Sequence, residues 1–448
     1  MARTDRVSKD VLLLDFFGED SRSLHQSLIQ AGFSGTTLVM EDDGFLPEGV
    51  ISVVRYFCGK SDTTGRPRYF NQIDVPDYWE ISGTNTQGAV HDLYHERGRI
   101  HYADPNYKRL VASVEWLDER GMVRYQDHYD DHGALYARTV FTKDGLRFSK
   151  SYFDGKGREV LVENYMTGDL ILNRKGKIYL FHGKVELTVH LLEELGLTDC
   201  RLMFNSLGAP FFVSERLPEN GKKDILFWQE NVRDDIPGNM QYILDGYSKR
   251  GGRIMVQKKP SYDKLLALGA SAEQVKLLGF IYPYVKENGM EKEVLICTNS
   301  DRIWRLTELV EKLPDLHFHI AALTEMSAKL MDMDKYDNVS LYPAVRMERL
   351  DELFKKCDYY LDINYESEIV SAVKRAFLHN QMILGCKETL HNPAYMAKEQ
   401  IYTDENAMAE ELSKMVENPV YLTAQLELQR QAAQAESKAR YCELLWAK

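Results

Sequence analysis

Glycines spaced twelve residues apart constrain the middle of this chain more than any other feature, and they stand at Gly121, Gly133, Gly145 and Gly157. Most of them follow or adjoin an aspartate, and Asp and Gly supply the positive-φ positions of tight β-turns. The stretches between them, such as residues 122–129 and 146–153, alternate aromatic or β-branched side chains with polar ones. Because residues 69–181 show almost no helical periodicity, the sequence predicts an antiparallel β-meander there.

The segments on both sides of this meander alternate between strand and helix patterns, which is typical of Rossmann-type parallel sheets. The predicted strands of the first such domain are residues 11–17, 36–40, 50–57, 201–204 and 253–257; its predicted helices are residues 21–31 and 187–195, with another beginning in 236–240. The predicted strands of a second domain are residues 293–297, 317–321, 358–362 and 381–386. A helix-rich tail follows from residue 407, and we expect its Gln- and Ala-rich stretch at 426–439 to be a plain surface helix.

We therefore predict an α/β protein of two Rossmann-type domains with the meander inserted in the first. The first domain is assigned to residues 1–68 and 182–288, the meander to 69–181, and the second domain with its C-terminal helices to 289–448.

Charge and composition exclude several classes of function. The net charge of −12, from 68 acidic and 56 basic residues, repels nucleic acid, so we expect no such partner. The charged N-terminus has no signal peptide, and no apolar stretch approaches the roughly 18 residues of a membrane span, which favours a cytoplasmic location. Six scattered cysteines without ligand spacing are interpreted as reduced core thiols. His317 and His319 alternate along a predicted strand, but without a third ligand we predict no metal site.

Residues 357–369, Cys-Asp-Tyr-Tyr-Leu-Asp-Ile-Asn-Tyr-Glu-Ser-Glu-Ile, together with residues 337–343, resemble the donor domain of retaining glycosyltransferases of the GT-B type. More closely, the whole chain, including the inserted meander, resembles the GtfA/GtfB family. This family adds N-acetylglucosamine to serine-rich repeat adhesins in Gram-positive bacteria with an accessory Sec system. The resemblance implies a GT-B-like pair of Rossmann-type domains, and within the family the chain is similar to the stabilising GtfB members.

The similarity to the stabilising members rests on charges that are missing. Active members of this superfamily carry two glutamates with seven residues between them; Glu366 fits the first position, but Lys374 occupies the second. Active members also carry an arginine and, five residues on, a lysine that neutralise the diphosphate. Arg302 fits the first of these positions and Thr307 occupies the second. These four residues are therefore interpreted as vestigial donor-site positions, and no cofactor is implied.

Each of these residues also has a plainer interpretation. Arg302 beside Asp301 can be a surface or capping charge, and Glu366 and Glu368 can be charges that favour a helix N-terminus. Other registers do not restore the missing groups, because a count from Glu368 reaches Ala376.

Two main hypotheses follow. In the first, the chain is a non-catalytic subunit that stabilises and activates a GtfA-like glycosyltransferase and binds the unfolded serine-rich repeat polypeptide, with Asn364, Glu366 and Ser367 in the peptide-binding groove. The resemblance further implies two copies of each subunit and peripheral association with the inner face of the cell membrane. In the second, the chain is a self-sufficient retaining UDP-sugar:peptide O-glycosyltransferase. A lectin-like module, suggested by the aromatic residues of the meander, is a third and weaker hypothesis.

Overall fold

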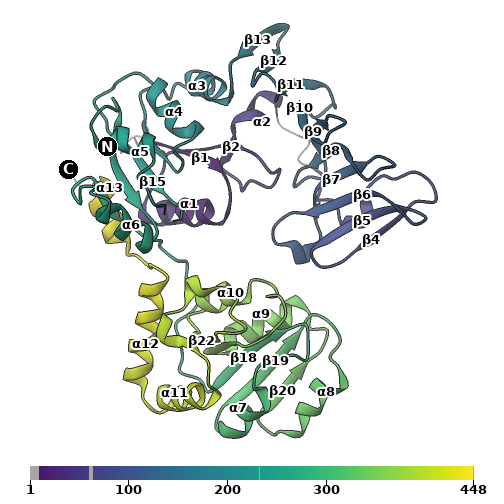
Figure 1. Cartoon of the computed structure of the whole chain (residues 1–448), viewed down its shortest axis with the longest axis vertical. Helices are drawn as coiled ribbons and strands as arrows, with labels where there is room; N and C mark the ends of the chain where they lie inside the picture. Colours follow the sequence, from purple (N-terminus) through teal and green to yellow (C-terminus); the bar gives the residue numbers. More distant parts are fainter. Residues whose placement is uncertain (1–9, 60–63, 232, 447–448) are drawn as a thin grey trace, which may run out of the picture. The chain divides into compact units, whose positions relative to one another are not determined.

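The predicted meander is a ten-stranded antiparallel sheet in the computed structural model, which describes residues 10–59, 64–231 and 233–446 (Figure 1). Its strands follow one another in chain order, so that β4 forms one edge and β13 the other. They are β4 (Glu80–Gly83), β5 (Gln87–Asp92), β6 (His95–Tyr102), β7 (Val111–Leu117), β8 (Val123–Tyr129), β9 (Leu135–Phe141), β10 (Arg147–Phe153), β11 (Glu159–Asn164), β12 (Leu170–Arg174) and β13 (Lys177–Phe181).

The regularly spaced glycines close the turns of this sheet, as predicted. All four have a positive φ, between 74° and 79°, and each donates its N–H to the carbonyl three residues earlier at 2.9 to 3.1 Å. In three of the turns the aspartate three residues before the glycine also accepts two backbone N–H groups through Oδ1. The N–H of Met122 lowers the pKa of Asp118, and the N–H of Arg158 lowers the pKa of Asp154. Aspartate and glycine therefore specify the same turn, one by hydrogen bonding and the other by backbone conformation.

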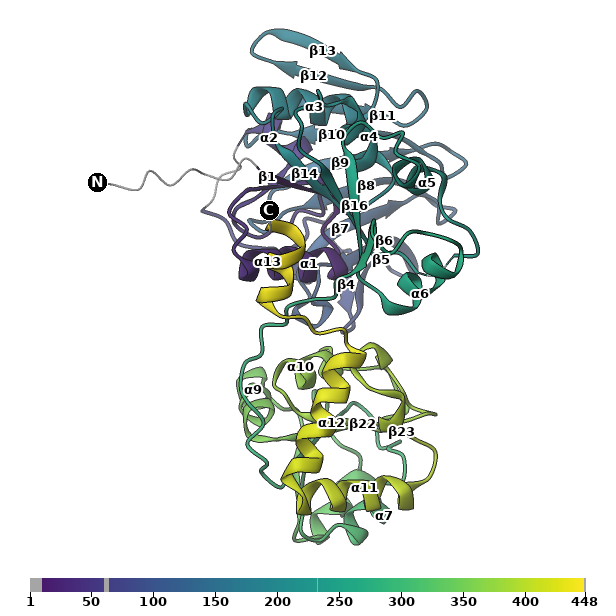
Figure 2. The same cartoon turned by 90° about the vertical axis from the view of Figure 1, so that its left-hand side faces the viewer.

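The first compact unit extends to Leu278 and contains both the meander and a seven-stranded, all-parallel sheet (Figure 2). The strand order of this sheet is β17-β16-β15-β14-β1-β2-β3. Its strands are β1 (Asp10–Phe16), β2 (Thr36–Glu41), β3 (Val50–Ser52), β14 (Arg201–Phe204), β15 (Asp224–Trp228), β16 (Gly251–Val256) and β17 (Val275–Leu277). Its helices are α1 (Glu19–Ala31), α2 (Val53–Cys58), α3 (Lys184–Glu194), α4 (Ala209–Arg216), α5 (Gly238–Leu244) and α6 (Lys259–Ala267).

The prediction of one strand over residues 50–57 was wrong. The strand ends at Ser52, whose hydroxyl accepts the backbone N–H of Arg55 at 3.1 Å and caps helix α2. The β propensity of this Val-rich run is only a weak preference. The Ser52 cap and the burial of the apolar side chains of α2 together favour the helix instead. Helix α2 buries Val53, Val54 and Phe57 against the meander.

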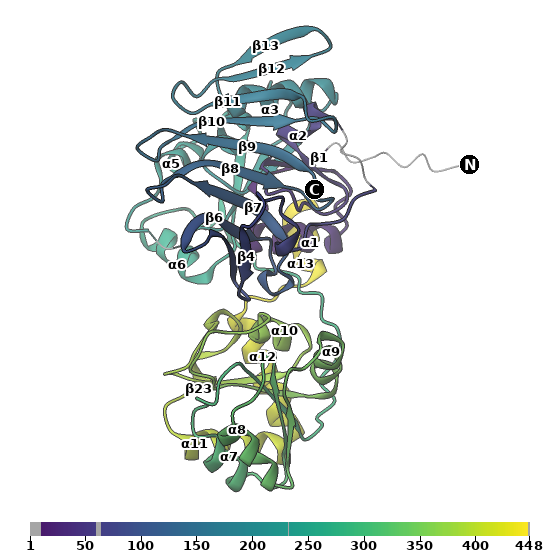
Figure 3. The same ribbon diagram turned by 90° about the vertical axis from the view of Figure 1, so that its right-hand side faces the viewer.

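The meander and the first parallel sheet share one hydrophobic core. The inner face of strands β9 to β12 contributes Tyr136, Tyr152, Leu161 and Leu172 to the cluster that also holds β1, β14 and α3. The opposite end of the meander has a separate small core around Val90, Ile100, Val111, Val114 and Tyr129. Figure 3 shows the strands in sequence from β4 to β13. The division into domains at residues 69, 182 and 289 stays a prediction.

The second compact unit, from Gly279 onward, contains a six-stranded parallel sheet in the order β20-β19-β18-β21-β22-β23. Its strands are β18 (Glu293–Thr298), β19 (His317–Ala322), β20 (Val339–Tyr342), β21 (Tyr359–Asp362), β22 (Met382–Cys386) and β23 (Ile401–Tyr402). Its helices are α7 (Leu306–Lys312), α8 (Ala328–Met331), α9 (Met347–Lys356), α10 (Ala372–Leu378), α11 (Glu405–Glu417), α12 (Pro419–Ala432) and α13 (Lys438–Trp446).

The tail contradicts the expected surface helix at residues 426–439. Helix α12 ends at Ala432, and both Leu426 and Gln429 are buried. The Gln429 amide accepts the N–H of Ile383 and donates to the carbonyl of Gln381, each at 2.9 Å. A buried glutamine is tolerated here because both ends of its amide are paired, a contact that the polar composition of the segment conceals.

The cysteines agree with their interpretation as core thiols. None of the six forms a disulfide; Cys442 is half-buried, and the buried ones are Cys58, Cys200, Cys297, Cys357 and Cys386. None of the helices in the described residues combines the length and the hydrophobicity that a membrane span requires.

Candidate functional site

Two loops meet at the carboxyl ends of strands β18 and β21, where ligands bind in open α/β sheets. One loop connects β18 to α7 and the other connects β21 to α10. Ile303 and Asn364 form an antiparallel bridge between them. Trp304 donates its N–H to the carbonyl of Ile363 at 2.8 Å, and Tyr365 donates its N–H to the carbonyl of Arg302 at 3.0 Å. The two loops that carry most of the predicted site residues are therefore held together by backbone pairing.

Asn364 organises the second of these loops from a buried position. Its carbonyl oxygen accepts the hydroxyl of Thr298 at 2.8 Å, and its amide nitrogen donates to the carbonyl of Glu366 at 2.9 Å. With 2% of its surface exposed, Asn364 shapes the loop from inside, while Glu366 and Ser367 are exposed beside it.

Arg302 and Glu366, two of the predicted vestigial donor positions, form an ion pair of 2.9 Å between the arginine Nη1 and the glutamate Oε1. The guanidinium also lies 5.5 Å from the centre of the Tyr365 ring. Both charged side chains are about half exposed, so the pair itself adds less than about 1 kcal/mol to stability. Its chemical consequence is that the glutamate carboxylate neutralises the one arginine expected to face a diphosphate.

The other two vestigial positions lie on separate helices. Thr307 is exposed on α7, where its hydroxyl approaches the sulfur of Met333 at 3.7 Å. Lys374 is half-buried on α10. Of the four vestigial positions, the structure therefore brings only Arg302 and Glu366 into contact with each other.

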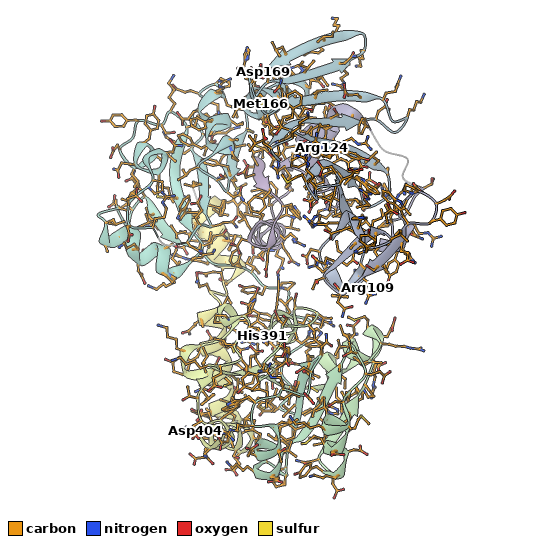
Figure 4. The ribbon with its side chains drawn as sticks, turned by 45° about the vertical axis from the view of Figure 1, so that its right-hand side comes forward. Arg109, Arg124, Met166, Asp169, His391 and Asp404 are labelled. Carbon is orange, nitrogen blue, oxygen red and sulfur yellow. The ribbon has the colours of Figure 1, made fainter. Side chains whose placement is uncertain are left out.

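His391, which the sequence analysis did not identify, stabilises the loop after β21 through two hydrogen bonds (Figure 4). Its Nδ1 lies 2.5 Å from Oδ1 of the buried Asp362, and its Nε2 lies 2.6 Å from the carbonyl oxygen of Glu366. The hydrogen bond to Asp362 raises the pKa of His391 to about 8. The available signal was a histidine just after the buried strand β22, at the edge where strand-end loops meet.

A cavity of about 500 Å³, here named the strand-end cavity, opens beside these loops within the second unit. Residues from the β18–α7 loop, the start of α7, α8, Tyr365, Glu388 and the start of α11 line it. Thr307 stands in its wall. Its volume falls within the range of roughly 300 to 1,000 Å³ that is usual for ligand sites.

His317 and His319 have protein partners. His317 Nε2 lies 2.7 Å from the hydroxyl of Ser340, and His319 lies between the hydroxyl of Tyr342 and the carboxylate of Glu293, at 2.9 and 2.6 Å. In the parts of the chain that the structure describes, no group of three His, Cys, Asp or Glu side chains is placed to hold a metal ion.

Comparison with known proteins assigns the family. Four family models match successive segments: the GtfB N-terminal domain at residues 11–57, the GtfB middle domain at 79–182, the GtfB third domain at 184–268 and the GftB/GlyA-F C-terminal domain at 294–429. A protein of Streptococcus agalactiae, the stabilizing protein GtfB of a UDP-N-acetylglucosamine–peptide N-acetylglucosaminyltransferase, is 42% identical over 97% of this chain and 98% of its own length. The chain belongs to the GtfB family.

Other members of the GtfB family are similarly related along their length. The GtfB of Limosilactobacillus reuteri is 35% identical over 97% of this chain and 98% of its own. A crystal structure of a GtfA/B complex bound to UDP and GlcNAc contains a chain with a TM-score of 0.91 at 37% identity, covering 97% of this chain and 99% of that one. A structure of accessory secretory protein 1, 2 and 3 from Streptococcus pneumoniae shares the fold, with a TM-score of 0.61 at 12% identity over 97% and 98% of the two chains.

Proposed function

We propose that this chain is a non-catalytic subunit that stabilises and activates a GtfA-like glycosyltransferase and binds the serine-rich repeat polypeptide to which N-acetylglucosamine is added. The observation that carries the proposal is the set of charged side chains at the β18–α7 and β21–α10 loops in a member of the GtfB family. Arg302 is paired with Glu366, and Thr307 and Lys374 stand where a transferase needs a cation and a carboxylate.

The loss of these charges is expected to slow sugar transfer strongly. Removing one preorganised charge that stabilises a developing anion costs about 3 to 4 kcal/mol, or a hundred- to thousandfold in rate. Here one cation is absent, and the remaining arginine is neutralised by an ion pair of 2.9 Å. A self-sufficient UDP-sugar transferase with these residues would therefore lack most of the positive charge that stabilises the nucleoside diphosphate as it leaves.

The meander is the surface we propose for docking the catalytic subunit, in an assembly with two copies of each subunit. Its edge strands β4 and β13 end the sheet, and such edges are commonly covered by pairing with another chain. The outer face of the β12–β13 hairpin also exposes aliphatic side chains, with Ile178 75% exposed and Leu180 56% exposed. Exposed aliphatic side chains beside a sheet edge are typical of an interaction surface.

For the peptide, we propose a groove that includes the loop of Asn364, Glu366 and Ser367. A serine-rich polypeptide has few apolar or charged side chains, so recognition has to use backbone groups and hydroxyls, each contributing about 1 kcal/mol. We place the working complex in the cytoplasm, with peripheral association at the inner face of the membrane.

A transfer assay with separated subunits tests the proposal. The chain alone, the GtfA-like partner alone and the co-expressed pair are each given UDP-N-acetylglucosamine and an unglycosylated serine-rich repeat peptide. We expect glycopeptide from the pair and none from this chain alone. Turnover by the isolated chain would refute the non-catalytic assignment, and a partner equally active and soluble by itself would refute the stabilising role.

A further inference from the structure

An exposed aromatic cluster lies on helices α4 and α5 of the first unit. Phe212, Tyr242 and Tyr247 expose 48%, 41% and 66% of their surfaces. Gly246, with φ +76°, follows α5 and turns the chain so that the Tyr247 N–H donates to the Tyr242 carbonyl at 3.1 Å. The ring centres of Tyr242 and Tyr247 lie 5.8 Å apart. Phe211 connects Tyr242 to Phe212, with ring centres 6.4 and 5.3 Å away, so the exposed rings form one cluster.

Two lysines border this cluster, in the loops before β15 and β16. Lys223 and Lys249 are both exposed, and the Lys223 ammonium donates to the Lys249 backbone carbonyl at 3.4 Å. Gly252 permits this approach, because a Cβ there would stand 2.6 Å from the Lys223 side chain. Among the described residues, neither lysine forms an ion pair with a carboxylate. Lys249 follows Tyr247 by two residues. We name this surface the α4–α5 patch, and it consists of Phe212, Lys223, Tyr242, Tyr247 and Lys249.

The segments that carry the α4–α5 patch are positive in an acidic protein. Residues 211–224 and 240–253 hold six cationic and four acidic side chains, whereas the net charge of the chain is −12. Three of the four carboxylates have partners within these segments: Asp224 pairs with the buried Arg250 at 2.8 Å, Glu215 accepts the Ser248 hydroxyl, and Asp245 accepts the Gln241 amide at 2.7 Å. The fourth, Glu219, is exposed. The two lysines therefore stand at the surface beside aromatic rings, while most of the nearby negative charge is already paired.

This combination of groups suits an anionic membrane surface. An acidic protein is repelled by such a membrane unless it presents a positive surface to it. Lysines near the headgroups are attracted to anionic lipids, and tyrosine rings favour the interface between headgroups and acyl chains. We propose that the α4–α5 patch binds anionic phospholipid headgroups at the inner face of the membrane. The inference rests on the peripheral association proposed above and gives it a location, separate from the meander that we propose for the catalytic subunit.

Flotation of the co-expressed complex with lipid vesicles tests this location. The vesicles contain about three parts phosphatidylcholine to one part phosphatidylglycerol, or phosphatidylcholine alone. Lys223→Gln with Lys249→Gln should weaken binding to the anionic vesicles about ten- to thirtyfold, because each lysine contributes about fivefold. Tyr247→Ser should weaken it about three- to tenfold through the lost apolar contact. The matched control is Lys143→Gln with Lys156→Gln, which removes two exposed lysines from turns of the meander and should stay within about twofold.

Co-elution with the partner and an unchanged thermal unfolding curve show that each variant has folded. If the complex binds the anionic vesicles and both patch variants bind like the control, the location is wrong while the peripheral association stands. If the complex binds neither kind of vesicle, the association itself fails, and the transfer assay still tests the stabilising role separately. Equal binding to both kinds of vesicle would overturn the role of anionic headgroups. A folded patch variant that no longer co-elutes with the partner would also overturn the inference, because the patch would then be a protein interface.

Discussion

His391 is expected to make the second unit less stable as the pH rises. Its two hydrogen bonds, to the Asp362 carboxylate and to the Glu366 carbonyl, use both ring nitrogens as donors, so the imidazolium form is required. The pKa of His391 is raised to about 8 in the folded chain, against an ordinary 6.5. A group that binds its proton more tightly when folded stabilises the fold fully below the unfolded pKa. That contribution is lost as the pH rises through the folded pKa, here between about 6.5 and 8.

The size of the effect follows from this difference in pKa. One pKa unit corresponds to about 1.4 kcal/mol, so the step from 6.5 to about 8 is equivalent to at most about 2 kcal/mol. The imidazole is close to the surface, with 14% of its side chain exposed, and solvent screening reduces the value. We expect the free energy of unfolding to fall by about 1 to 2 kcal/mol between pH 6 and pH 9 on account of this residue.

Urea unfolding of the unchanged chain and of His391→Gln at both pH values isolates this contribution. The transition is followed by tryptophan fluorescence, to which the buried Trp304 of the same unit contributes. The variant should lose less stability than the unchanged chain over the same pH interval. His182→Gln is the control, because His182, just after β13, pairs with Asp169 at 2.9 Å but is largely exposed. Equal pH dependence in the unchanged chain and in His391→Gln would refute the reasoning.

Three further predictions concern other parts of the molecule. Asn364→Ala removes two hydrogen bonds made by a buried amide, one from the Thr298 hydroxyl and one to the Glu366 carbonyl, so the free energy of unfolding should fall by about 1 to 3 kcal/mol in urea titration; a change below about 0.5 kcal/mol would contradict the buried role of the amide. The double variant Thr307→Lys with Lys374→Glu restores both donor-site charges and should bind UDP-N-acetylglucosamine at least about tenfold more tightly by calorimetry, whereas unchanged affinity would mean that other residues block the site. Gly157→Ala forces a side chain into φ +74° and should lower the thermal stability by about 1 to 2 kcal/mol; the control Gly238→Ala, at the first residue of α5 with open space around it, should not, and equal effects would contradict the turn argument.

The meander was predictable because its information is local. A turn that needs a positive φ can be read from one glycine and its preceding aspartate, and four such turns at equal spacing specify hairpins without reference to the rest of the chain. The parallel sheets were predictable for a related reason, since strands buried on both faces appear as continuous apolar runs, as in β1 and β18. Local patterns failed where burial decided the outcome, at the start of α2 and at Gln429 in α12.

The sequence by itself determined which charged groups this chain lacks at the vestigial donor-site positions. Counting from Arg302 and Glu366 leads to positions 307 and 374, which hold a threonine and a lysine. It could not determine what the remaining charges do. The pairing of Arg302 with Glu366 joins residues 64 positions apart, and the contact of His391 with Asp362 joins residues 29 positions apart. Both pairs form because the carboxyl ends of parallel strands meet at one edge of the sheet, and the order of strands in that sheet is decided by tertiary packing.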